Sequence, residues 1–178
     1  SNKEHKLIME AMDYKDSEED GGWDEGGKDV EPFPTIRKMK IEDAGPLFEL
    51  MSNPEVMKYM EPPYDYDKTL EFLEEYGIKE PPYVFTVTDE DKFVGYAIFH
   101  EYEEDSMEIG WVLSPSVWGR GYATELTHMM MEQAKGQTQK LIIECDPEQK
   151  ASQRIAEKCG FTFIGEEDDL YVYQYTLQ

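Results

Sequence analysis

A chain of 178 residues is long enough for one domain with a substantial hydrophobic core and short for two. Its 40 acidic and 17 basic residues give a formal net charge of −23, which argues against binding to nucleic acid or to an anionic membrane surface. The charge favours cationic partners such as amines, polyamines, aminosugars or basic peptides, and a merely solvated acidic surface explains it equally well.

The cysteines and the hydropathy pattern indicate the compartment. Cys145 and Cys159 are too far apart for a C-x-x-C pair, so we expect free thiols in a reducing environment. No apolar run approaches about 18 residues, and no secretory segment opens the chain. We therefore expect a cytoplasmic protein without a membrane anchor.

Residues 1–34 form an acidic, glycine-rich arm that precedes the folded domain of residues 35–178. Ser1 and Asn2 are interpreted as a remnant of tag cleavage. The composition of the rest is typical of a flexible segment. We expect the arm to dock on its own domain or on a neighbouring chain with Trp23 as an anchor, and a homodimer is one of the alternatives left open.

The first half of the domain has helical periodicity. A strand is expected over 35–39, followed by helices over 42–52, 54–59 and 67–76. In the third helix, Leu70, Leu73 and Tyr76 are expected to face inward.

The second half alternates as strands do and is then interrupted by two helices. Strands are predicted over 83–88, 92–100, 106–113, 140–145, 161–165 and 170–177, and helices over 122–135 and 151–159. The last two strands are expected to flank an acidic loop, Glu166–Asp169. This order indicates a single α/β domain, a mixed sheet with helices on both faces.

One loop carries recognisable chemistry. The sequence Trp118-Gly119-Arg120-Gly121-Tyr122-Ala123 follows a predicted strand and opens a predicted helix. The first N–H groups of a helix lack partners and lie at its positive end, so they bind anions, and glycines let a phosphate approach the backbone. A lone G-x-G also fits many ordinary strand-to-helix turns.

Three segments in order resemble one known family. Glu108-Ile109-Gly110-Trp111, the stretch Trp118–Glu125, and the stretch Asp146–Phe161 are similar to motifs of the GNAT N-acetyltransferases, which use acetyl-coenzyme A. The resemblance covers about residues 35–177. Ile41–Met60 also resembles the opening helices of the branch that contains ribosomal-protein and some antibiotic acetyltransferases. The family's fold is a mostly antiparallel mixed sheet flanked by helices, with two strands splayed at the cofactor slot.

The resemblance implies how acetyl-coenzyme A is held. Its pyrophosphate would lie on the glycine loop, and its pantetheine arm would run beside the strand that contains Gly110. The loop departs from the family at Trp118, where Gln or Arg is frequent, and Gln149 stands where the branch usually has Asn. The residues expected to bind the cofactor are Trp111, Val112, Leu113, Gly119, Arg120, Gly121, Tyr122, Ala123, Thr124, Gln149 and Ser152.

The chemistry of acetyl transfer and the resemblance together suggest the catalytic groups. Glu108 is expected to act as the base through a water, and its alternative is a solvated strand residue. The position of the tyrosine acid found in many members is Ala156 here. Ser152, which matches a serine of the branch, is therefore expected to contact the departing thiolate. A helix-cap role for Ser152, and an acid drawn from Tyr171, Tyr173 or Tyr175, stay open.

No metal is expected, because His100 and His128 have no carboxylate or cysteine at ligand spacing. By the same resemblance, the acidic loop 166–169 would lie beside the acceptor entrance, where it could attract a cation. We interpret the chain as an enzyme that transfers the acetyl group to a primary amine, either a peptide N-terminus or a small cationic amine, by direct attack. The alternative is a non-catalytic acyl-coenzyme A sensor with the same fold.

Overall fold

The computed structural model of the protein describes residues 34–178. The predictions for the acidic arm, including the Trp23 anchor, lie outside these residues. From Pro34 onward the chain forms one mixed α/β unit, as the element order predicted.

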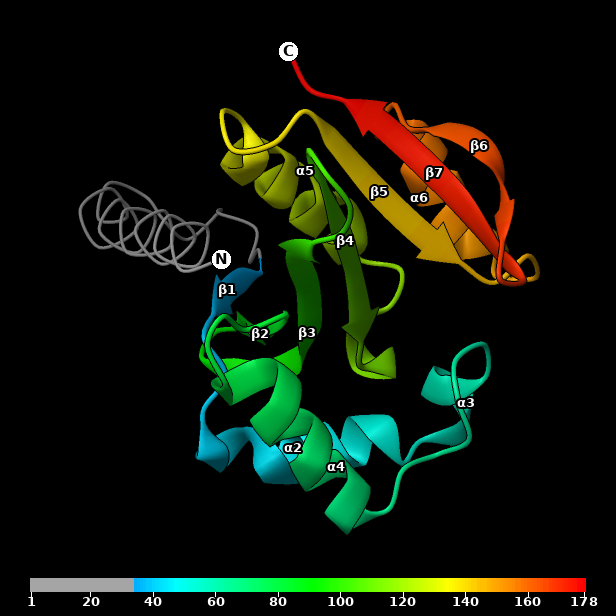
Figure 1. The fold of residues 1–178 in the computed structure, drawn as a ribbon. Coiled ribbons are helices and arrows are strands. Elements are labelled where there is room, and N and C mark those ends of the chain that lie inside the picture. The colour runs from blue at the N-terminus through cyan, green and yellow to red at the C-terminus, as the bar shows by residue number, and fades with distance from the viewer. Residues whose placement is uncertain (1–33) are drawn as a thin grey trace, which may run out of the picture.

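Seven strands of residues 34–178 form a single sheet in the order β1-β2-β3-β4-β5-β7-β6 (Figure 1). All neighbouring pairs are antiparallel except β4 and β5, which run parallel. The mostly antiparallel mixed sheet is therefore confirmed. The strands are β1 (Thr35–Arg37), β2 (Val84–Asp89), β3 (Lys92–Glu101), β4 (Ser106–Leu113), β5 (Lys140–Cys145), β6 (Thr162–Glu167) and β7 (Leu170–Thr176).

Helices cover both faces of the sheet. On one face, a core of Leu47, Leu73, Tyr96 and Val112 packs the sheet against helices that precede β2. On the other, Leu126 and Met130 of α5 pack on Ile109 and the apolar face of β5. The first group comprises a 3-10 turn (Ile41–Asp43), α2 (Ala44–Met51), α3 (Pro54–Met57) and α4 (Tyr66–Phe72), which continues as a π-helical segment (Leu73–Ile78). The second comprises α5 (Tyr122–Ala134) and α6 (Lys150–Lys158).

The predicted inward position of Tyr76 is wrong. Its side chain is 42% exposed, while Leu73 and Gly77 of the same π-helical segment are buried. A π-helical turn holds more residues than an α-helical turn, so it moves later side chains off the face that a 3.6-residue period predicts. Tyr76 consequently lies on the surface beside Phe72, with ring centroids 5.4 Å apart.

The acidic loop Glu166–Asp169 is also shorter than predicted. β6 continues through Glu167, and the connection to β7 consists of Asp168 and Asp169, whose φ values are 51° and 66°. Two consecutive positive φ values are typical of the tight hairpin turn whose twist matches that of the strands. Glu166 and Glu167 are therefore strand residues, and only two of the four acids lie in the turn.

The parallel pair β4–β5 is short, and this opens the sheet. Pairing extends only from Ser106–Lys140 to Glu108–Ile142. Beyond Glu108 the two strands diverge, while β3 stays paired with β4 up to Leu113 (Figure 1). The backbone of β4 after Glu108 therefore has no strand partner on the β5 side.

Candidate functional site

A cavity of about 570 Å³ lies where β4 and β5 diverge. Its walls come from the end of β4, the glycine loop, the first turns of α5 and α6, and α3 with the residues after it. The lining includes every residue predicted to bind the cofactor except Arg120, namely Trp111, Val112, Leu113, Gly119, Gly121, Tyr122, Ala123, Thr124, Gln149 and Ser152.

The glycine loop has the conformation that an anion cradle requires. Gly119 and Gly121 have φ values of 77° and 80°, which residues with a Cβ rarely adopt. An added Cβ at either glycine would meet no atom within 4 Å, so the glycines serve the backbone conformation and leave the approach open. Gly121 is the N-cap of the 13-residue helix α5 and provides no capping side chain. The first N–H groups of α5 are thus available to a phosphate, and the residues fit the pyrophosphate of coenzyme A.

Trp118 ties the loop to the sheet. Its indole N–H donates to the carbonyl of Leu113 at the end of β4, over 2.8 Å. The rest of the side chain is 45% exposed and lines the cavity. The residue that departs from the family pattern therefore holds the loop against β4.

Arg154, and not Arg120, is the arginine that lines the cavity. Arg120 is exposed and lies beside Tyr122, whose hydroxyl donates to the Asp89 carboxylate over 2.5 Å. Arg154, from α6, lines the cavity instead. Because α6 is strongly amphipathic in sequence, its polar face could be predicted, but which cation on that face meets the cavity depends on how α6 packs.

Ser152 and Gln149, at the start of α6, line the same cavity as the glycine loop. Ser152 is 8% exposed and Gln149 is the N-cap residue, without a capping bond from its side chain. Ala156, one turn later, is fully buried and supplies no hydroxyl. None of the three tyrosines of β7, Tyr171, Tyr173 and Tyr175, lines the cavity; they pack against the main core.

Four residues of α3 and of the segment after it were missed as parts of this site. Val56, Tyr59 and Met60 line the cavity together with Glu55. Met60 is 43% exposed although it is apolar. Their spacing indicated a helix face, but α3 is too short for periodicity to tell a core face from a cavity wall.

Glu108 does not line this cavity. It is the last residue of β4 that pairs with β5, on the sheet face covered by α2 and α4. Its Oε1 lies 2.9 Å from Nε2 of His100 on β3, and the two side chains are 21% and 16% exposed. The predicted base is therefore half-buried and paired with a histidine that the sequence had not connected to it.

His100 is held from three sides. Nδ1 lies 2.7 Å from the carbonyl oxygen of Glu101, and the ring stacks on Tyr83 with centroids 4.4 Å apart and an interplanar angle of 11°. Burial lowers the pKa of His100. The hydrogen bonds to Glu108 and to the Glu101 carbonyl outweigh burial, so that the pKa lies above its usual value.

More carboxylates gather on the same side of the divergence. The Tyr102 hydroxyl donates to Glu144 of β5. Burial raises the pKa of Glu144, the Tyr102 bond opposes this, and the charges of Glu108, Glu167 and Asp168 raise it further. The end of the β6–β7 hairpin is therefore within electrostatic reach of the divergence.

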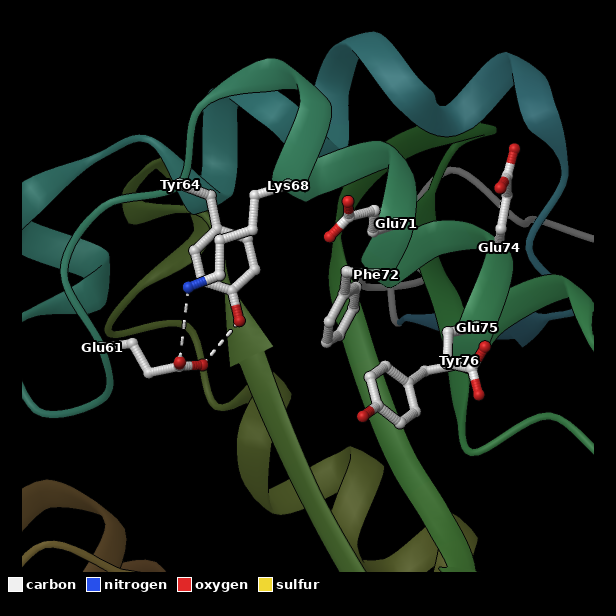
Figure 2. Close-up of a pocket in the computed structure, with 8 residues that line it drawn as sticks. All are labelled: Glu61, Tyr64, Lys68, Glu71, Phe72, Glu74, Glu75 and Tyr76. Carbon is white, nitrogen blue, oxygen red and sulfur yellow. Dashed lines mark hydrogen bonds and ion pairs between the residues drawn. The ribbon is translucent and has the colours of Figure 1, made fainter.

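A second pocket, of about 740 Å³, lies on the α4 side of the sheet (Figure 2). Its rings are Tyr64, Phe72 and Tyr76, and its acids are Glu61, Glu71, Glu74 and Glu75. The single cation, Lys68, lies over Tyr64 with its Nζ 4.4 Å from the ring centroid, and 3.6 Å from Glu61. The pocket thus already accommodates an ammonium between a carboxylate and a ring.

Comparison with known proteins gives one consistent result. The family model of the acetyltransferase (GNAT) domain matches residues 35–162. An uncharacterized N-acetyltransferase of Bacillus subtilis, YnaD, is 29% identical over 130 residues, which cover 70% of this chain and 76% of that protein. A GNAT-family acetyltransferase from Bacillus anthracis has a TM-score of 0.73 at 27% identity and covers 81% of this chain and 95% of its own.

A further structural similarity is at the level of the fold. The spermidine N-acetyltransferase of Vibrio cholerae, solved in complex with coenzyme A and spermine, has a TM-score of 0.69 at 22% identity, over 80% of this chain and 95% of its own. In residues 34–178, no helix is long and apolar enough to cross a membrane. The same residues contain no cluster of three or more potential metal ligands among His, Cys, Asp and Glu.

Proposed function

The chain belongs to the GNAT acetyltransferase family and is an acetyl-coenzyme A-dependent acyltransferase, and from this premise we propose that it acetylates a cationic primary amine by direct attack. The observation that carries the proposal is the cavity at the β4–β5 divergence. It joins a helix N-terminus with a glycine cradle to a strand edge without a partner. The cradle suits the pyrophosphate and the strand edge suits the amides of the pantetheine arm.

The proposed chemistry assigns one task to each side of the divergence. Acetyl-coenzyme A supplies the acetyl thioester. Glu108 accepts a proton from the ammonium through a water, and the neutral amine nitrogen attacks the thioester carbonyl carbon. The C–N bond forms and the C–S bond breaks. Ser152, which lines the cavity, donates a hydrogen bond from its hydroxyl to the departing thiolate. The nitrogen then loses its second proton, which passes to the thiolate to give the free thiol of coenzyme A, and Glu108 returns its own proton to the solvent.

The α4-side pocket supports a cationic acceptor. Four carboxylates against one lysine make its wall strongly negative, and its rings add the faces that attract organic cations (Figure 2). A row of ring contacts runs from this pocket toward Glu108. Phe72 contacts Tyr76, Tyr76 contacts Tyr83 at 5.9 Å, and Tyr83 stacks on His100, the partner of Glu108. The pocket and the proposed base thus lie on one side of the sheet.

The test measures thiol release from acetyl-coenzyme A by the full chain over a panel of amines. The panel contains monoamines, di- and polyamines, aminosugars and peptides with free N-termini, and mass spectrometry of the products identifies the acetylated nitrogen. We expect turnover with polycationic amines, and a fall in kcat on the order of 100-fold for Glu108→Gln. Retained turnover in Glu108→Gln across pH would remove Glu108 from the mechanism.

Variants of the α4-side pocket test the acceptor class. Glu71→Gln combined with Glu74→Gln is expected to raise KM for the cationic acceptor several-fold and to leave KM for acetyl-coenzyme A unchanged. Glu49→Gln, an exposed acid of α2 outside the pocket, is the matched control. An unchanged acceptor KM in the double variant would place the acceptor elsewhere.

The second candidate is a sensor that binds acyl-coenzyme A without turnover. It is favoured by the buried Ala156 at the position where many family members have a tyrosine acid. Calorimetric binding of acetyl-coenzyme A without thiol release for any amine of the panel would support the sensor and contradict the enzyme.

A further inference from the structure

Both ring nitrogens of His100 face oxygen atoms. Nε2 is 2.9 Å from Oε1 of Glu108, and Nδ1 is 2.7 Å from the backbone carbonyl of Glu101. A carboxylate and a carbonyl only accept hydrogen bonds. A neutral imidazole has one N–H, so it can satisfy only one of these two contacts. The geometry is therefore that of an imidazolium, and the raised pKa of His100 agrees with it.

The imidazolium cannot turn freely. Its plane lies on the Tyr83 ring at an angle of 11°, and β3 and β4 hold His100 and Glu108 as directly opposed residues. The acids that face it are Glu108 from β4 and Glu144 from β5, and the hydroxyl of Tyr102 is bonded to Glu144. The pairing thus fixes the position of one carboxylate oxygen of Glu108 from a rigid ring.

The other oxygen of Glu108 is left for the reaction. The His100 ring contacts only Oε1. Within residues 34–178, no residue hydrogen-bonds to the second oxygen. Glu108 is the last residue of β4 that pairs with β5, so its side chain leaves the backbone at the point where the two strands begin to diverge. One oxygen of Glu108 is therefore held by His100, and the other is free to accept a proton.

We propose that His100 is a positioning residue for the acetyl transfer, whose imidazolium orients the Glu108 carboxylate so that its second oxygen receives the proton of the acceptor ammonium. The inference rests on the proposed function for its catalytic part, and on geometry alone for the charged His100–Glu108 pair. His100 itself neither gains nor loses a proton in the transfer.

The proposal has a definite pH dependence. The pair is intact while His100 is protonated, below its raised pKa. As the pH rises through that pKa, the ring loses one N–H and one of the two oxygen contacts becomes repulsive. The neutral ring can then no longer satisfy both oxygens, and it loses the positive charge that attracts the Glu108 carboxylate, so Glu108 is held less firmly. Activity therefore declines on the alkaline side even as the acceptor amine becomes more easily deprotonated.

The first experiment needs no substrate. Nitrogen-15 NMR of the full-length chain, labelled at the histidines, follows the protonation of each ring with pH. We expect His100 to be doubly protonated at about pH 6.5, with a pKa that falls in Glu108→Gln, while that substitution leaves the ring signals of His128, an exposed residue of α5, unchanged. A neutral His100 ring at that pH, or a pKa indifferent to Glu108→Gln, overturns the proposal.

The second experiment uses pH profiles of kcat with an amine found in the panel. His100→Ala should lower kcat roughly 10- to 100-fold with KM for acetyl-coenzyme A unchanged. His100→Gln keeps a neutral donor for Glu108, so it should recover part of kcat and lose the alkaline decline, and His128→Gln should retain the wild-type profile. A wild-type kcat and profile in His100→Ala overturns the positioning role.

The two experiments separate the failures. If the NMR titration shows a charged His100–Glu108 pair but no amine is turned over, the proposed function and the catalytic part of this inference are both contradicted. The charged pair itself then stands. Turnover in the wild type with no response to His100→Ala contradicts the inference and leaves the proposed function standing.

Discussion

A single glycine of β3 allows this strand to approach the end of β4 closely. Gly95 has a φ of 150°, and a Cβ at this position would lie 2.2 Å from the carbonyl oxygen of Val112 and 2.9 Å from the Cα of Leu113. It lies beside the irregularity where the pairing of β2 with β3 shifts after Val87. Backbone atoms of β4 cannot yield as a flexible side chain would, so only glycine permits this approach.

Gly95→Ala is therefore expected to destabilise the fold by at least about 2 kcal/mol, because overpacking against backbone forces β3 and β4 apart. The check is the midpoint and slope of urea unfolding. Gly45→Ala is the matched control, since a Cβ there meets no atom within 4 Å and alanine is the better helix former in α2. Equal stability of the two variants would show that β4 can relax at Val112.

Individual residues could be predicted from the sequence where the local backbone conformation determines the residue type. The cradle glycines Gly119 and Gly121 could be predicted because positive φ before a helix N-terminus is a local requirement. His100 could not, because its link to Glu108 depends on the register of β3 against β4, which no short stretch of sequence determines. Arg154 was missed for the same reason, since helix packing selects it from several cations of α6.

At the scale of elements, one buried carboxylate joins three parts of the opening region. Asp43 is 3% exposed and accepts hydrogen bonds from Arg37 of β1 at 2.7 and 2.9 Å, from the N–H of Lys40 at 3.0 Å, and from Thr86 of β2 at 2.8 Å. Burial raises the pKa of Asp43. The bonds from Arg37, Lys40 and Thr86 outweigh burial and hold the pKa below its usual value.

Because its pKa is lower in the folded than in the unfolded protein, Asp43 stabilises the fold above its unfolded pKa of about 4, and this contribution is lost as the pH falls through the folded pKa. Asp43→Asn should cost roughly 2 kcal/mol at pH 7, since it leaves Arg37 without its carboxylate. The difference from wild type should shrink below about pH 4. Urea unfolding at several pH values measures it, with the exposed neighbour Glu42→Gln as control, and a pH-independent difference would contradict the role of charge.

Most elements could be predicted from periodicity, and the exceptions have physical causes. β4 and β5 have the predicted bounds because alternation and a buried apolar run are strong signals. The π-helical segment after α4 could not be expected, because an extra residue in a turn leaves the composition unchanged. The divergence of β4 and β5 could be predicted only from the family resemblance. It depends on where the pairing of the two strands ends, which periodicity does not reveal.

At the scale of the whole molecule, charge acts on donor and acceptor in opposite directions. A net charge of −23 repels the polyanionic coenzyme A, and the N-terminus of α5 with Arg154 must supply a local attraction. The same field, reinforced by the four glutamates of the α4-side pocket, would attract the cationic amine that we propose as the acceptor. The negative charge of the protein therefore repels acetyl-coenzyme A and favours the binding of a cationic acceptor.

Ionic strength should separate these two effects. The screening length falls from about 30 Å at 0.01 M to about 10 Å at 0.1 M salt, so both long-range forces weaken over this range. We expect KM for acetyl-coenzyme A to fall and KM for a polyamine acceptor to rise, each by roughly two- to five-fold, with a smaller rise for a monoamine. Initial rates at several salt concentrations, with the other substrate saturating, give both constants. Movement of both constants in the same direction would show that salt acts on the protein itself, because an electrostatic field cannot attract an anion and a cation together.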